Sequence, residues 1–195
     1  MWQTARLSIR QFRNDDWSDL HELQGDPQAT QFIGGPWTRE KTERVTKLIV
    51  ASYRSNPWEW LAVAARGTDR VLGVCWLGHL NAKWCAALGW EPCIELGYRF
   101  ARCYWGSGYA TEAARAMLDR GFNELGLKRI VAIVDIENNA SERVLNKLGM
   151  SYARSGTDGS VTVGGYEMDR GGFIAATSTW AGDVGIDRGK SQLPL

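Results

Sequence analysis

The chain is poor in the side chains that most often bind metals. It has two histidines, His21 and His79, and four cysteines, none of which forms a CxxC pair. Structural zinc sites are usually built from closely spaced cysteines and histidines. The sequence therefore predicts no bound metal, and cysteines that stay reduced in a cytoplasmic protein.

Long apolar runs and an excess of one charge are also absent. The start, MWQTARLSIRQF, has no apolar segment of signal-peptide length, and no run reaches the roughly 18 apolar residues of a membrane span. The chain has 23 basic and 22 acidic residues, which gives a formal net charge of +1. Nucleic acids and anionic membranes usually attract a basic surface. We therefore expect a protein that binds neither.

The length of 195 residues fits one domain that buries its own core. We place this domain at residues 1–170. The remaining segment, residues 171–195, is rich in small and polar residues with little periodicity. It is therefore expected to be a loosely ordered C-terminal tail.

The apolar periodicity predicts an α/β fold with a mixed central sheet of about seven strands and flanking helices. The strands are expected at residues 5–12, 58–66, 71–80, 93–100, 129–136, 152–156 and 161–169. Helices are expected at residues 14–25, 38–54, 109–125 and 140–149. The helix between the fourth and fifth strands predicts a crossover that makes those two strands parallel.

The segment WGSGYATEAARAML, residues 105–118, places two glycines directly before the clearest helical pattern of the chain. A tight turn is one interpretation. A phosphate site is the other, because the first turn of a helix has unpaired amides and a partial positive charge. Glycine would let a phosphate approach the backbone closely. The segment lacks the Gly-Lys-Ser/Thr of a Walker loop, and Thr111 stands where a dinucleotide fingerprint has its third glycine.

Two blocks of sequence together resemble the GNAT acetyltransferases. The segment ELGYRFARCYWGSGYATEA resembles the acetyl-CoA signature of that family, with Trp105 where the general form has Gln or Arg. The segment ENNASERVLNKLGM resembles the block that follows the fifth strand of the family fold. The pattern is most like the branch that contains ribosomal-protein N-acetyltransferases and their small-molecule relatives. The resemblance covers about residues 6–170.

The resemblance implies a GNAT fold, in which the fourth and fifth strands splay apart in a V that admits acetyl-CoA. It implies transfer of an acetyl group from acetyl-CoA, a co-substrate, to an amine without a metal. Pantetheine contacts are expected from Tyr98, Arg99 and Phe100 on one strand and from Asn138 after the next. The pyrophosphate is expected on the loop formed by Trp105, Gly106, Ser107, Gly108, Tyr109 and Ala110.

Glu95 is the candidate general base, because it lies on the strand that leads into the glycine loop. An alkylammonium group has a pKa of about 10.4, so only about one amine in two thousand is neutral near pH 7. A carboxylate that accepts the proton is the usual solution. The structural alternative is that Glu95 lies on a solvated face or pairs with Arg99, since a charge is costly to bury without a partner.

The leaving thiolate is the second catalytic question. Some relatives protonate it with a tyrosine on the helix after the fifth strand, and Leu145 occupies that position here. Ser141 matches a serine given this role in the ribosomal branch. Serine is also a preferred helix cap, and the two roles are compatible. A thiol of pKa about 8.5 needs little help to leave, so water is a sufficient acid.

Aromatic side chains in the first half of the chain are candidates for the acceptor pocket. Seven of the ten tryptophans lie between Trp17 and Trp90. Trp37 and Trp58 are the chosen pocket residues, with Tyr53 and Trp60 as further wall candidates and His79 at the end of a strand. The structural alternative is that the aromatic residues form core and that His79 is structural.

Three functions fit this sequence. The first is acetylation of a small-molecule amine, and the second is acetylation of a protein N-terminus. The third is binding of coenzyme A without transfer. The chain is also compatible with a homodimer. The balance of charge slightly disfavours a strongly basic or acidic protein substrate, and the many tryptophans slightly favour a small amphipathic amine.

Overall fold

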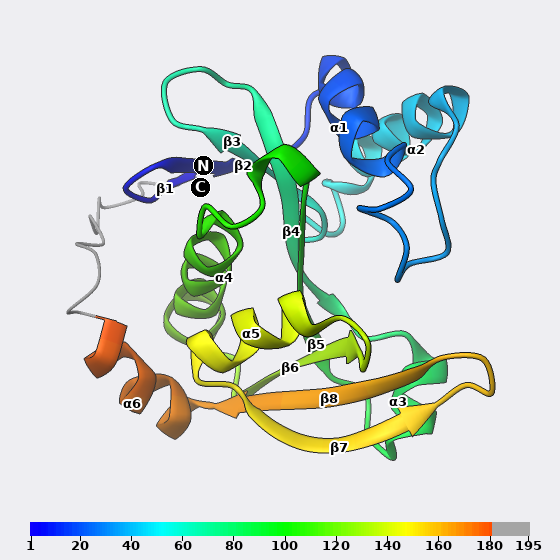
Figure 1. Ribbon diagram of the computed structural model, residues 1–195. Coiled ribbons are helices and arrows are strands. Elements are labelled where there is room, and N and C mark those ends of the chain that lie inside the picture. The colour runs from blue at the N-terminus through cyan, green and yellow to red at the C-terminus, as the bar shows by residue number, and fades with distance from the viewer. Residues whose placement is uncertain (181–195) are drawn as a thin grey trace. The chain divides into compact units, whose positions relative to one another are not determined.

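The computed structural model describes residues 1–180, in which eight strands form one mixed sheet in the order β1-β2-β3-β4-β5-β6-β8-β7 (Figure 1). The strands are β1 (Trp2–Gln3), β2 (Leu7–Arg10), β3 (Leu61–Ala65), β4 (Val71–His79), β5 (Ile94–Phe100), β6 (Arg129–Asp135), β7 (Ser151–Thr157) and β8 (Thr162–Asp169). The expected mixed sheet is confirmed. The additional strand is β1, a two-residue strand that pairs antiparallel with β2.

The described residues contain six α-helices, and the helix predicted to start after Thr38 does so. They are α1 (Trp17–Gln24), α2 (Arg39–Ser52), α3 (Ala82–Leu88), α4 (Tyr109–Asp119), α5 (Asn139–Leu148) and α6 (Arg170–Trp180). Thr38 caps α2, since its Oγ1 accepts a hydrogen bond from the Lys41 amide at 3.2 Å. After Asp119 the chain continues as a π-helical turn, Arg120–Glu124. Within residues 1–180, no helix is long and apolar enough to cross a bilayer.

β5 and β6 form the parallel pair that the crossover predicts. Glu95 lies opposite Val131 in their register, near the start of both strands. β6 then pairs antiparallel with β8 along its whole length. The V between the two parallel strands stays a prediction.

By their internal contacts the described residues divide into two compact units. Unit 1 contains residues 1–75 and 98–113, and unit 2 contains residues 76–97 and 114–180. The chain passes from one unit to the other within β4, β5 and α4. The boundary therefore lies inside the domain expected at residues 1–170.

Unit 1 packs α1 and α2 with the first strands of the sheet. Its core residues include Leu7 and Ile9 of β2, Leu61 and Val63 of β3, and Leu20 and Leu23 of α1. A buried ion pair adds a specific contact, because Arg10 donates from both terminal nitrogens to Asp16 at 2.6 and 2.8 Å. A buried pair of this kind sets which groups meet more than it adds stability. It holds the segment before α1 on β2.

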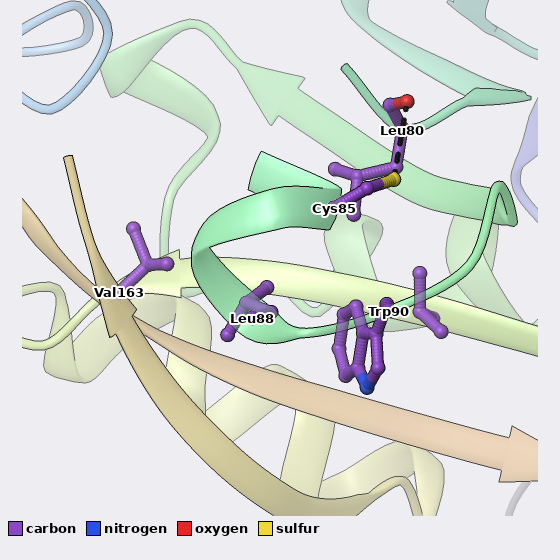
Figure 2. Close-up of a cluster of buried hydrophobic side chains, with 6 residues drawn as sticks. Leu80, Cys85, Leu88, Trp90 and Val163 are labelled. Carbon is purple, nitrogen blue, oxygen red and sulfur yellow. Dashed lines mark hydrogen bonds between the residues drawn. The ribbon is translucent and has the colours of Figure 1, made fainter. Parts of the chain in front are cut away.

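Unit 2 has a core that α3 builds with β6 and β8 (Figure 2). Leu88 and Trp90 are 2% and 7% exposed, and they pack with Leu80, Cys85, Val131 and Val163. Asn81 caps α3 by accepting a hydrogen bond from the Lys83 amide at 2.8 Å. The segment between β4 and β5, for which the sequence predicted no definite structure, is therefore a helix anchored by its apolar side.

The expectation of a loose tail from residue 171 is wrong for its first ten residues. They belong to α6, in which Phe173 and Trp180 are 3% and 4% exposed. Phe173 stacks on Phe122 at 4.9 Å between ring centroids, and the Arg115 guanidinium lies 5.1 Å from the Trp180 ring. Two aromatic anchors bury enough apolar surface to order a segment with weak periodicity. Residues 181–195 lie outside the described part.

Candidate active site

The glycine loop lies in unit 1, between β5 and α4. Gly106 and Gly108 have φ values of +74° and +78°. Residues with a Cβ rarely adopt this left-handed region, so both positions require glycine for their backbone conformation. A Cβ on Gly106 would meet no atom within 4 Å. The loop therefore presents open backbone, as a phosphate site requires.

The start of α4 supplies amide donors at the end of this loop. The first intrahelical bond runs from the Glu112 amide to the Gly108 carbonyl at 3.0 Å. The amides before Glu112 precede this bond and have no carbonyl one turn earlier in the helix. They lie at the positive end of the helix dipole, where an anion is stabilised. The geometry fits the pyrophosphate of a nucleotide.

Arg6 is a residue of this loop region that the sequence analysis did not identify. Its Nη1 donates to the Ser107 carbonyl at 2.9 Å, and its Nη2 lies 2.6 Å from Glu112. The guanidinium also lies 4.5 Å from the centroid of the Tyr109 ring. Thr4 donates to the same Glu112 carboxylate at 2.5 Å. The opening segment thus holds the loop and brings a cation beside it.

The end of β5 faces α4 through Phe100. Phe100 is 4% exposed, and its ring stacks on Tyr109 at 6.4 Å between centroids. Trp105, which is 48% exposed, donates from its indole nitrogen to the Phe100 carbonyl at 2.8 Å. Ala110 follows in the first turn of α4 and is half-buried. These contacts fix where the loop leaves the strand.

Arg99 points to other elements of unit 1. Its Nη1 donates to Oε1 of Gln24, on α1, at 2.9 Å, and its guanidinium lies 5.8 Å from the Trp60 ring centroid. Burial lowers the pKa of Arg99 to about 10, because desolvation disfavours the charged form. Its neighbours Tyr98 and Phe100 are half-buried and buried. Gln24 is a second residue that the sequence did not indicate.

Glu95 lies in unit 2, on the first half of β5, and is half-buried. Burial raises the pKa of Glu95 to about 7, while a hydrogen bond from Trp76 acts in the opposite direction. A Cβ on Gly97 would overlap the Trp76 indole, so the missing side chain makes room for that ring. A carboxyl group with this pKa can accept and release a proton near neutral pH.

Asn138 and Ser141 lie at the start of α5 in unit 2, and the structure corrects which of them caps the helix. Asn138 is the cap, because its Oδ1 accepts a hydrogen bond from the Ser141 amide at 3.1 Å. Ser141 is therefore not the capping residue. An asparagine before the first turn can reach the amide three residues on, and this geometry had been assigned to the serine. The Asn138 Oδ1 is committed to the helix.

The aromatic candidates separate into two pairs within unit 1. Trp37 stacks on Trp60 at 6.4 Å between centroids, with an angle of 30° between the planes. Trp58 instead contacts Trp2 at 5.9 Å. Tyr53 donates to the Trp60 carbonyl at 2.6 Å. Trp37 and Trp60, with the Arg99 guanidinium nearby, make the better-defined wall.

His79 is the last residue of β4 and belongs to unit 2, where it is exposed. Across residues 1–180 no three His, Cys, Asp or Glu side chains are grouped so that they could hold a metal ion.

The family model described as an acetyltransferase (GNAT) domain matches residues 6–151. This match spans parts of both units, including the glycine loop, Glu95 and Asn138. The fold implied by the two sequence blocks is thus supported by a whole-domain match.

Several known proteins are similar to the chain. YkkB of Bacillus subtilis is 47% identical over 154 residues, covering 78% of this chain and 86% of that protein. The FsC-acetyl coenzyme A-N(2)-transacetylase of Aspergillus fumigatus is 36% identical over 170 residues, covering 78% and 65%. The crystal structure of a GNAT-family acetyltransferase from Bacillus anthracis has a TM-score of 0.73 at 26% identity, covering 86% and 97%.

A more distant structural neighbour shares the fold. The spermidine N-acetyltransferase of Vibrio cholerae, solved with CoA and spermine, has a TM-score of 0.68 at 16% identity. The alignment covers 86% of this chain and 98% of that one.

Proposed function

The chain belongs to the GNAT acetyltransferase family, and we propose that it transfers the acetyl group of acetyl-CoA to a primary amine of a small molecule by direct attack. The observation that carries the chemical part of this proposal is Glu95. It is a half-buried carboxyl group with a pKa of about 7, on the strand that leads into the glycine loop.

The donor binds through unit 1 in this proposal. The pyrophosphate accepts hydrogen bonds from the backbone amides of the loop and of the first α4 turn, where Gly106 and Gly108 leave the backbone open. Arg6 holds the loop through the Ser107 carbonyl, while Glu112 balances its charge. The pantetheine arm takes the backbone of Tyr98 to Phe100 as an added strand would, with Asn138 as a further contact.

The first chemical step is the removal of a proton from the acceptor amine. An alkylammonium of pKa about 10.4 is mostly protonated near pH 7, and ionised Glu95 accepts its proton directly or through water. The neutral amine nitrogen then attacks the thioester carbonyl carbon. The tetrahedral intermediate then loses a second nitrogen-bound proton to water as its carbonyl re-forms and the carbon–sulfur bond breaks. The CoA thiolate leaves and is protonated by water or by the Ser141 hydroxyl.

Similarity to named enzymes supports a small acceptor. The relative from Aspergillus fumigatus is named for transfer from acetyl coenzyme A to an N(2) nitrogen, and a fold neighbour is named for spermidine. The half-buried Trp37 and Trp60 stack offers apolar surface that a small amine could contact. A protein N-terminus remains the competing acceptor, and a binding module without transfer is the third possibility.

A thiol-release assay with acetyl-CoA tests the proposal. We expect thiol release with at least one small amine from a chemically diverse panel, and weaker or no release with N-terminal peptides. Acetyl-CoA should also raise the melting temperature, because a ligand that binds only the folded state stabilises it. Transfer confined to peptides would contradict the small-molecule acceptor. Binding without transfer to any acceptor would favour the third possibility.

A further inference from the structure

The guanidinium of Arg99 has no carboxylate partner among the residues that the structure describes. Its hydrogen-bond acceptor is the neutral Oε1 of Gln24, at 2.9 Å. Arg99 is half-buried, so its charge is only partly hydrated. A guanidinium offers five donor hydrogens in a planar fork, and a carboxylate is the group that fits this fork with two hydrogen bonds.

Acidic side chains of α1 and α2 pair with other arginines. Glu22 pairs with Arg70 at 2.9 Å and Glu43 with Arg39 at 3.0 Å. Lys41 places a second cation 4.8 Å from the centroid of the Trp37 ring. The aromatic wall therefore carries two cations, Lys41 and Arg99, one against each ring.

Gln24 supplies a second, independent observation. Its side chain is 0% exposed, and its Nε2 has no hydrogen-bond partner among the described residues. A buried amide donor without an acceptor is costly. Because Oε1 of the same amide accepts a hydrogen bond from Arg99, the unpaired Gln24 donor and the Arg99 guanidinium lie at one place. Both are donors, so both call for an acceptor oxygen.

The aromatic residue beside Arg99 is held in a fixed position. Trp60 has a φ of +54°, a conformation that residues other than glycine rarely adopt. Tyr53 links this segment to the start of the chain, since it donates to the Trp60 carbonyl at 2.6 Å and accepts from the Phe12 amide at 2.9 Å. A rigid apolar ring beside a cation is suited to a ligand with an apolar body and an anionic end.

We propose that the acceptor of this enzyme is an amine that also carries a carboxylate, and that the carboxylate binds Arg99 and Gln24 while the apolar body lies along Trp60. This inference rests on the proposed function. It separates the chain from acetyltransferases of polyamines, because a polycation would meet Lys41 and Arg99 as like charges. The substrate class is an amino acid or a similar zwitterion with an apolar side chain.

Matched amines test this substrate class. Phenylalanine and phenethylamine differ by the carboxylate alone, and spermidine represents the polyamines. We expect the wild type to acetylate phenylalanine with a kcat/KM about tenfold or more above that of phenethylamine, as a charge-assisted bidentate contact allows. In Arg99→Met, the kcat/KM values for the two amines should fall within about threefold of each other. Equal loss for both amines, or a preference for spermidine, would overturn the inference.

Two further variants protect the test against a folding defect. Gln24→Glu keeps the Arg99 charge but supplies a carboxylate within the protein, so it should remove the same preference. Arg13→Met changes an arginine that pairs with the exposed Asp69 and should leave the preference unchanged. Stabilisation by acetyl-CoA shows that each variant is folded.

Direct binding separates the inference from the proposed function. Calorimetry with phenylacetate and phenylacetamide compares an anion with its neutral isostere and requires no turnover. We expect phenylacetate to bind about tenfold more tightly in the wild type and equally in Arg99→Met. If this preference holds but no amine is acetylated, the anion site stands and the proposed transfer fails. If amines are acetylated and phenylacetate shows no preference, the inference fails alone.

Discussion

The glycine loop of unit 1 and the Glu95 region of unit 2 both depend on glycine, for opposite reasons. Gly108 has a φ of +78°, and an added Cβ would have Arg6 Nη2 at 3.4 Å as its nearest neighbour. Gly97 lies in an extended strand, and an added Cβ would overlap the Trp76 indole. The first glycine is required by the backbone and the second by a neighbouring side chain. Open space leaves the loop backbone accessible, whereas close packing buries Glu95 and raises the pKa of its carboxyl group.

Replacement of Glu95 by Gln should have the largest effect on activity. Loss of a general base typically lowers turnover by about 100-fold or more. In the wild type, kcat/KM should rise with pH through about 7, because burial raises the pKa of Glu95 to that value and only its ionised form accepts a proton. This rise should be absent from the pH profile of the variant.

The stability of the Glu95→Gln variant provides a control. At pH 8 the wild-type carboxylate is ionised against the cost of its burial, and a neutral amide avoids that cost. The variant should therefore melt at or above the wild-type temperature at pH 8 and still be stabilised by acetyl-CoA. Glu91→Gln removes an exposed carboxylate nearby and should change neither rate nor pH profile. A wild-type pH profile in Glu95→Gln would exclude Glu95 as the base.

Gly97→Ala should have an intermediate effect, on stability. The new methyl group would require the Trp76 ring to move, and overpacking of this kind costs about 1–3 kcal/mol. Chemical denaturation measures this loss directly. Gly172→Ala, in α6, is the matched control, because its Cβ would make ordinary contacts at 3.4 Å or more. Unchanged stability in Gly97→Ala would show that Trp76 does not depend on the absence of a side chain there.

Gly108→Ala should have the smallest effect, on donor affinity. The left-handed conformation is strained for alanine, so the loop is expected to relax away from the geometry that binds phosphate. We expect acetyl-CoA to bind about tenfold more weakly, as lost charge-assisted hydrogen bonds allow. Gly126→Ala has the same backbone cost at a φ of +65°, with no atom within 4 Å of the new Cβ. Equal losses of affinity in both variants would point to general destabilisation instead of a loop effect.

Much of the fold follows from local patterns in the sequence. The apolar periodicity predicted seven of the eight strands and the parallel pair of β5 and β6, because strand and helix periods are visible over short windows. It missed α3, which is short, and α6, whose helix depends on Phe173 packing against Phe122. The cap of α5 was placed on Ser141 instead of Asn138, since both residue types favour helix starts.

The candidate site likewise has features that the sequence indicated and features that only the tertiary structure shows. Family resemblance and helix chemistry were enough to indicate an acetyl-CoA loop at Gly106 and Gly108 and a carboxylate at Glu95, and the roles of these residues stay predictions. The sequence could not show that Arg6 reaches the Ser107 carbonyl, 101 residues away, or that Arg99 reaches Gln24, 75 residues away. No local pattern connects such partners.

Consecutive residues were thus enough to predict a donor site at the glycine loop, because backbone conformation and the charge at a helix end are local properties. The pKa of Glu95, the contact of Arg6 with the loop and the contact of Arg99 with Gln24 depend on packing between distant segments. Desolvation and ion pairing act through space, so these properties exist only in the folded chain.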